Sequence, residues 1–246
     1  MRTIKFFSTV PGVAEAYPVI ESREYRPQWV AGARENYLRA MEQASGDRIS
    51  NLYRCPGIFD IMQTGYIIRS PWDIMIETKG DGSDFKWTIP SSDLPRIFNS
   101  PLVNGHMEAD IAGSLPGRPN TLRSIVKFNL PWHVVAPPGV KLLVLPIPYP
   151  DTFEFEHSTG ILDPGFSTEI NAQLWWKVLK GNVLIKAGMP LMQLIPISED
   201  KFNFEVSTAT EKEIEWVKKK EYLHNLSFVM KRGLMKAMYL KHFFKR

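Results

Sequence analysis

Proline and glycine interrupt this chain so often that a helical bundle is excluded. The 246 residues include 19 prolines and 16 glycines, which end helices and favour turns. From Ser124 to Ile197, turn signals recur about every eight to twelve residues and separate short β-branched or apolar runs, which is typical of a sandwich or barrel. The sequence therefore predicts about six short strands there.

The first 120 residues combine a helix with strands. Apolar residues recur every three or four positions from about Pro27 to Gln43, which predicts an amphipathic helix. Asn51 to Trp87 is rich in β-branched and aromatic residues and predicts a first sheet, with a hairpin turn at Asp81-Gly82. Pro, Gly, Ser and Asn dominate Ile89 to Asn120, so we expect a long loop there.

The end of the sequence differs from the rest in charge. From Glu211 onward, ten Lys or Arg residues accompany four acidic residues, although the formal net charge of the whole chain is only +4. Thr210 to about Tyr222 and Asn225 to Phe244 have helical periodicity, and Thr210 with Glu213 matches a capping box. A basic amphipathic tail of this kind packs on its own domain, binds a partner or lies on an anionic surface.

These segments predict a mainly β protein with α additions. Residues 1–208 are expected to form one composite β-rich domain, in which 1–120 hold the N-terminal helix and first sheet and 121–208 hold the β core. Residues 209–246 form the helical tail. No run approaches the roughly 18 apolar residues needed to span a membrane, and the only cysteine, Cys55, cannot form an internal disulfide. We therefore expect a cytoplasmic protein.

The β core carries a resemblance to a known superfamily. Residues 160–174 read Gly-Ile-Leu-Asp-Pro-Gly-Phe-Ser-Thr-Glu-Ile-Asn-Ala-Gln-Leu, and residues 185–195 read Ile-Lys-Ala-Gly-Met-Pro-Leu-Met-Gln-Leu-Ile. With the upstream Pro-Pro-Gly turn and its strand, this pattern resembles the dCTP deaminase and dUTPase superfamily. The resemblance spans Ser124 to Ile197. It implies the β-clip fold and a homo-oligomer, with a trimer favoured.

The resemblance does not extend to the superfamily's catalytic groups. The strand glutamate that acts as general base in the deaminases aligns with Gln173, whose amide cannot take up a proton near neutral pH. A Ser-Ser-x-x-Arg segment should follow Pro146, but the chain has no serine pair or arginine there. The acids Asp151, Glu154 and Glu156 in that stretch would repel a triphosphate. Neither ancestral activity is expected.

The retained positions supply the candidate binding residues. Asp163 and Phe166 belong to the Asp-Pro-Gly-Phe turn, and Gln173 and Gln193 lie on the strands that follow. We predict that these four residues bind a nucleotide-like ligand, although an Asp in such a turn commonly caps the turn itself. If an enzymatic reaction has moved to other groups, His157 and Asp163 are the catalytic candidates, assisted by the Glu154/Glu156 pair.

A metal or cofactor is not predicted. His106 with Glu108, His133 and His157 could in principle hold iron, but each histidine in the β region is explained as a strand residue. No Walker loop, nucleophile elbow or dinucleotide fingerprint occurs. Cys55 is interpreted as a buried structural thiol, and the loop with Arg118 and Arg123 as a solvated one.

For the tail, a protein partner is the interaction considered. The candidate partner-binding residues are Lys231, Arg232, Met235, Met238, Phe243 and Phe244.

Three functional hypotheses follow. The first is a β-clip protein that has lost or diverged from catalysis and binds a nucleotide-like ligand or protein partners. The second is a virion structural or assembly protein, which acts in the host cytoplasm or the virion. It is motivated by residues 65–73, which read Gly-Tyr-Ile-Ile-Arg-Ser-Pro-Trp-Asp and resemble a group of bacterial and phage proteins. The third is an enzyme that processes a nucleotide or metabolite with relocated groups.

Overall fold

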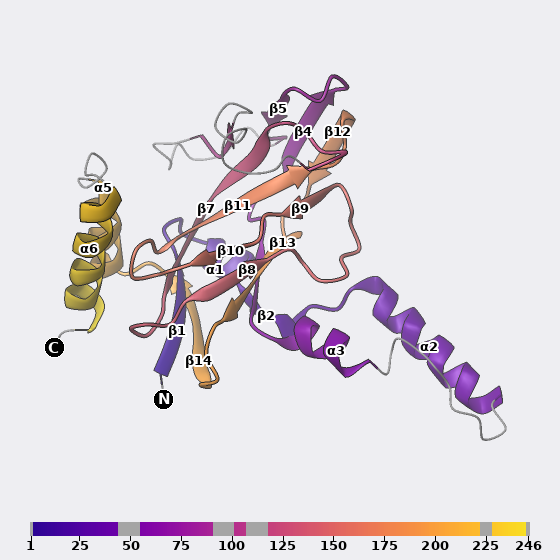
Figure 1. The fold of residues 1–246 in the computed structure, drawn as a ribbon, viewed down its shortest axis with the longest axis horizontal. Coiled ribbons are helices and arrows are strands. Elements are labelled where there is room, and N and C mark those ends of the chain that lie inside the picture. The colour runs from indigo at the N-terminus through magenta and orange to yellow at the C-terminus, as the bar shows by residue number, and fades with distance from the viewer. Residues whose placement is uncertain (1, 44–54, 91–100, 107–117, 222–227, 245–246) are drawn as a thin grey trace.

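The described residues of the protein form three β-sheets, with helices at both ends of the long axis (Figure 1). The computed structural model describes residues 2–43, 55–90, 101–106, 118–221 and 228–244. The first sheet has the order β14-β1-β7-β11-β9, with β6 also paired to β7; the second has the order β10-β8-β13-β3-β2; and the third has the order β12-β4-β5. Strands predominate among the described elements, which confirms the mainly β prediction. Among these strands, no sheet closes on itself, so they do not form a closed barrel.

The strands are short, as the turn spacing predicts. The first sheet contains β1 (Arg2–Ser8), β6 (Val103–His106), β7 (Ile125–Val135), β9 (Phe155–His157), β11 (Glu169–Trp176) and β14 (Phe202–Thr208). The second contains β2 (Ile20–Glu21), β3 (Tyr66–Arg69), β8 (Leu142–Leu145), β10 (Gly160–Leu162) and β13 (Pro190–Pro196). The third contains β4 (Ile74–Lys79), β5 (Phe85–Thr88) and β12 (Lys180–Ile185).

In each sheet, a strand from the first half of the sequence pairs with a strand from the second half. In the second sheet β3 pairs with β13, in the third β4 pairs with β12, and in the first β1 pairs with β7. The three sheets share one apolar core, whose largest fully buried side chains include Trp132 and Trp176. The predicted first sheet and the predicted β core therefore contribute strands to the same sheets and are not separate sheets.

Two sequence expectations fail locally. Residues Pro56–Gln63 form helix α3 instead of a strand, with Pro56 in its first turn and with Ile58 and Met62 buried one turn apart. Pro131 predicts separate strands before and after it, but the two runs form a single strand, β7. Pro131 is tolerated because the register of the neighbouring β11 shifts between its first residues opposite this part of β7, where a ladder N–H is not required.

Other expectations are met. The N-terminal helix α2 (Gln28–Gln43) has the predicted bounds to within a residue, and β4 and β5 form the hairpin around Asp81-Gly82. The short helices α1 (Val13–Ala16) and η1 (Ser22–Glu24) were not anticipated. Most of the predicted loop 89–120 lies outside the described residues.

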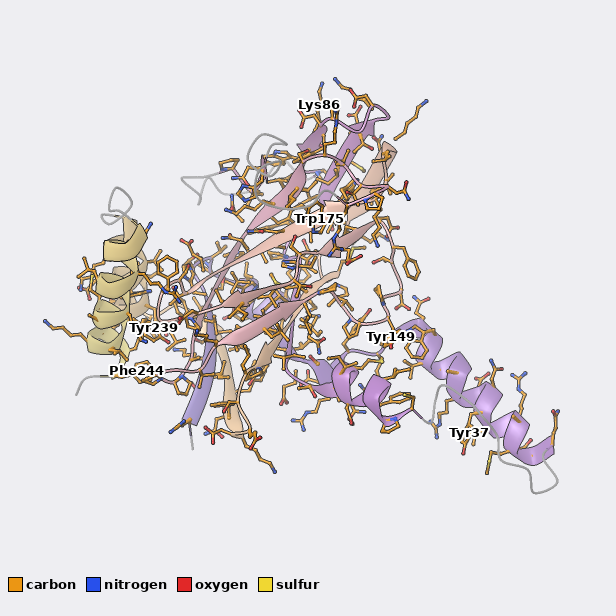
Figure 2. All side chains as sticks on the ribbon, in the orientation of Figure 1. Tyr37, Lys86, Tyr149, Trp175, Tyr239 and Phe244 are labelled. Carbon is orange, nitrogen blue, oxygen red and sulfur yellow. The ribbon has the colours of Figure 1, made fainter. Side chains whose placement is uncertain are left out.

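The tail packs on the first sheet. It comprises α5 (Glu211–Glu221), α6 (Phe228–Tyr239) and the π-helical turn η3 (Leu240–Phe244), and its buried side chains form a second core with β1 and β7. Figure 2 shows Tyr239 on the side of α6 that faces the sheet. Its hydroxyl donates to the Ala136 carbonyl (2.7 Å) and accepts from the Ala136 N–H (2.9 Å). The tail is thus fixed to the body by polar and apolar contacts.

The predicted capping box begins α5. The Glu213 carboxylate accepts from the Thr210 N–H (2.8 Å), and the Glu213 N–H donates to the Thr210 hydroxyl (3.4 Å). The other Glu213 oxygen contacts the Lys5 ammonium at 2.7 Å, so the same side chain links α5 to β1. In the part of the chain that the structure describes, no helix is long and apolar enough to cross a membrane.

Candidate functional site

A cleft of about 270 Å³ opens where the chain passes from the first sheet to the second. β9 is an edge strand of the first sheet and β10 is an edge strand of the second. The link between them therefore borders both sheets. The apolar part of the cleft includes Met192 and Leu194 of β13, which are almost fully buried. The polar part includes Ser158, Asn171 and Gln173. An apolar base with a few hydrogen-bonding groups is typical of a small-molecule site.

The polar residues of β11 lie on one face of the strand. Asn171 and Gln173 line the cleft together with Glu169 and the buried Ile170, whereas the buried Ala172 between the two amides does not. Successive side chains of a strand point to opposite sides of the sheet. The residue spacing of two was visible in the sequence, and it was the signal that could have added Asn171 to Gln173 as a candidate.

His157 forms one wall of the cleft and is part of the backbone network. Its Nδ1 lies 2.6 Å from the Ser158 carbonyl oxygen, and its Nε2 lies 3.1 Å from the Gln173 backbone nitrogen. A carbonyl can only accept and an amide N–H can only donate, so the ring is neutral with its proton on Nδ1. Burial lowers the pKa of His157 to about 4. Both ring nitrogens are therefore occupied at neutral pH.

Asp163 and Phe166 do not line this cleft. The Asp163 carboxylate accepts from the Gly165 N–H (3.1 Å), and its carbonyl accepts from the N–H groups of Phe166 and Ser167, each at 2.9 Å. The Asp163 side chain therefore caps its own turn. Phe166 packs against the apolar core of the tail.

Gln193 points to the opposite side of β13 from the cleft. Its neighbours Met192 and Leu194 line the cleft, so strand alternation turns Gln193 away from it. The amide group is fully buried and donates to the carbonyls of Ile61 (2.7 Å) and Thr64 (2.6 Å). It attaches α3 to the second sheet. Of the predicted ligand and catalytic residues, the structure brings His157 and Gln173 together and leaves Asp163, Phe166 and Gln193 apart.

A second cleft of about 210 Å³ lies on the other side of His157 and has Pro150, Phe153 and Lys177 in its wall. Beside it, Glu156 forms ion pairs with Arg118 and with Lys177, the latter at 3.1 Å. Burial acts to raise the pKa of Glu156, but hydrogen bonds and charges from the two cations hold it below its usual value. Glu156 is therefore a structural carboxylate, and Arg118 belongs to this ion pair instead of a solvated loop.

The described histidines are not placed together to hold a metal ion. Within the described ranges, no group of three His, Cys, Asp or Glu side chains is placed to hold a metal ion. His133 contacts the Thr168 hydroxyl (3.0 Å), which also accepts from the Trp216 indole N–H (3.1 Å). His106 lies on β6, and Glu108 lies outside the described residues. Cys55 is exposed, contrary to the buried thiol that was expected.

The tail residues expected to bind a partner differ in how exposed they are. Met235 is fully buried against β1 and β7, so its expected role in partner binding is wrong. Met238 and Phe243 are half-buried on the same core. Arg232 and Phe244 are exposed. Lys231 is half-buried.

No protein-family model and no curated protein matches the sequence. Among solved structures, the chain is similar to one titled "EIAV dUTPase native", with 18% sequence identity and a TM-score of 0.30. The similarity covers 56% of this chain and 80% of that one. Similarity at this level does not assign the chain to that enzyme's family, and no activity is transferred from it.

Proposed function

We propose that the protein binds a small nucleoside-like ligand in the cleft between β9, β11 and β13, without transforming it. The observation that carries this proposal is the pair of amide side chains, Asn171 and Gln173, on the face of β11 that lines the cleft. An amide offers a donor and an acceptor together, which matches the hydrogen-bonding edge of a nucleobase. Met192 and Leu194 provide an apolar surface for its ring.

The electrostatics of the cleft favour an uncharged group. No Lys or Arg is among its lining residues in the described part of the chain, and Glu169 adds a negative charge. A phosphate inside the cleft would lose its hydration without gaining an opposite charge. The ligand portion that enters the cleft is therefore a base or nucleoside, and any phosphate stays outside it.

The arrangement of the candidate acids and bases supports binding over catalysis. The imidazole of His157 accepts one hydrogen bond and donates the other, so it can take a proton only after a backbone bond breaks. Asp163 is engaged in its own turn. A general base has to lie within hydrogen-bond reach of the proton that it removes, and neither group is free to do so.

The β-clip interpretation, the trimer, and the cytoplasmic or virion location stay predictions, and they rest on the sequence motifs quoted above. Ligand binding is testable without them.

The test is calorimetric titration with nucleobases, nucleosides and nucleoside monophosphates, using wild type and the variants Gln173→Leu and Asn171→Leu. We expect at least one nucleoside to bind, with each variant weakening it by about tenfold or more, the equivalent of about 1.4 kcal/mol. Asn182→Leu, on the exposed part of β12, is the matched control and should bind as wild type does. Absence of binding across the panel, or equal binding by Gln173→Leu, refutes the proposal.

A further inference from the structure

Helix α2 extends away from the sheets and lies at the opposite end of the molecule from α5 and α6 (Figure 1). We call α2 the arm. None of its 16 residues is buried. A helix of this length is only marginally stable in water by itself, because most helical stability in proteins comes from packing one face. The arm therefore gains stability if its exposed face is covered.

The base of the arm is held by the loop before β9. Both carboxylate oxygens of Asp151 lie 3.0 Å from the Gln28 backbone nitrogen, at the helix N-terminus. The Trp29 indole N–H donates to the Tyr149 carbonyl at 2.9 Å, and the two rings meet edge to face. An acidic cap at a helix N-terminus satisfies a backbone donor and complements the helix dipole. The arm is thus directed outward from a fixed base.

The outer face of the arm carries large apolar side chains. Leu38 is 49% exposed and Met41 is 51% exposed. At helical spacing, Arg34 and Glu42 share a face with Leu38, since residues four apart lie one above the other. All four residues are exposed. The half-buried positions Ala33 and Tyr37 lie on another side of the helix.

The charges on this face are self-complementary. Arg34 and Glu42 stand four residues before and four residues after Leu38. When two such helices pair antiparallel about a two-fold axis at Leu38, each Arg34 meets the Glu42 of the other helix, and the two Leu38 side chains meet at the centre. A two-fold interface uses the same patch on both subunits, and opposite charges across it set the orientation.

We propose that the arm is a self-association element, which pairs with the arm of a second copy of this chain in antiparallel orientation. This inference is independent of the proposed ligand. One helix pair covers less surface than the roughly 1,600 Å² of a standard interface. The dimer is therefore weak and forms as the protein concentration rises.

Sedimentation velocity over a concentration series tests this association. We expect wild type to change from monomer toward dimer, and Leu38→Glu to remain monomeric at concentrations where wild type associates. Asn36→Glu is the matched control, because it adds the same charge at an exposed position on the far side of the helix. It should associate as wild type does. Circular dichroism of each variant confirms that the fold is retained.

A charge exchange identifies the second copy as the partner. Arg34→Glu and Glu42→Arg should each weaken association, because like charges then meet across the two-fold axis, and the double variant should restore it. In a Cys55→Ser background, Leu38→Cys should form a disulfide-linked dimer under mild oxidation, whereas Asn36→Cys should not. The proposal is overturned by a protein that stays monomeric at every concentration, by association that Leu38→Glu leaves unchanged, or by a double variant that fails to restore pairing.

Discussion

Removing the hydroxyl of Tyr239 tests whether the tail is fixed to the body through this group. The side chain is 2% exposed, and its hydroxyl satisfies both the N–H and the carbonyl of Ala136, which is 1% exposed. Tyr239→Phe keeps the ring and leaves these two backbone groups without that partner. An unsatisfied buried group costs about 1–3 kcal/mol, so we expect the contact between tail and sheet to lose about 3 kcal/mol.

The loss should appear first as local opening of the tail. Because 1.4 kcal/mol corresponds to a tenfold change in an equilibrium, the detached tail becomes about a hundredfold more populated. Trypsin cleaves after the lysines of α5 and α6, and its rate follows the open population when opening is fast. We therefore expect a large increase in the rate of tail cleavage in native buffer, and a lower urea midpoint if the tail unfolds together with the sheets.

Tyr149→Phe is the control for the same chemical change at an exposed site. Tyr149 is 46% exposed and accepts the Trp29 bond through its backbone carbonyl, which the substitution retains. Trypsin should cleave the tail of Tyr149→Phe at the same rate as the tail of wild type. Cleavage of Tyr239→Phe within twofold of wild type, with an unchanged urea midpoint, would refute the reasoning about the hydroxyl.

The remaining predictions concern a buried histidine and a glycine. Because burial lowers the folded-state pKa of His157 to about 4 and the unfolded value is about 6.5, the unfolded state binds the proton more readily. The contribution of His157 to the free energy of unfolding is then full above about pH 6.5 and falls by about 3 kcal/mol as the pH drops to 4. Urea unfolding at several pH values measures this loss. His157→Gln should flatten the pH dependence, and an equal slope in both proteins would contradict this prediction. Gly65 has a φ of +84°, and a Cβ there would lie 2.1 Å from the Leu194 carbonyl oxygen. Gly65→Ala should therefore lower the free energy of unfolding by about 3 kcal/mol or more. Gly82→Ala, at a φ of +71° with open space around it, should lower it by about 1 kcal/mol in the same assay. Similar losses in both variants would show that the contact with β13 is unimportant.

Local sequence signals predicted the elements whose determinants are local. Pro27 and the apolar spacing that follows it gave α2, Thr210 with Glu213 gave the start of α5, and Asp81-Gly82 gave the β4–β5 hairpin. In each case the residues that decide the structure lie within one or two turns of one another. α3 was missed because a short apolar run such as Ile58 to Met62 suits a buried strand and a helix equally.

The candidate site depended on contacts that a motif does not encode. Asp163, Phe166 and Gln173 are close in sequence, but the turn and the strand direct them into a cap, the tail core and the cleft. Gln193 was selected for its place in a motif, but its amide instead donates to the carbonyls of Ile61 in the distant helix α3 and of Thr64 just after it. The direction of each side chain follows from strand alternation once the pairing is known, and the pairing joins residues far apart in the chain.

The pairing of β1 with β14 sets an order of events for a chain emerging from the ribosome. Arg2 lies opposite Phe202, and the two strands run parallel through Ser8 and Thr208. Phe6 and Phe7, both fully buried in the finished protein, lie opposite Val206 and Ser207, which the ribosome adds about 200 residues later. Contacts of such sequence separation form slowly. The first sheet therefore cannot be completed before β14 has been synthesised, and β1 needs protection from aggregation until then.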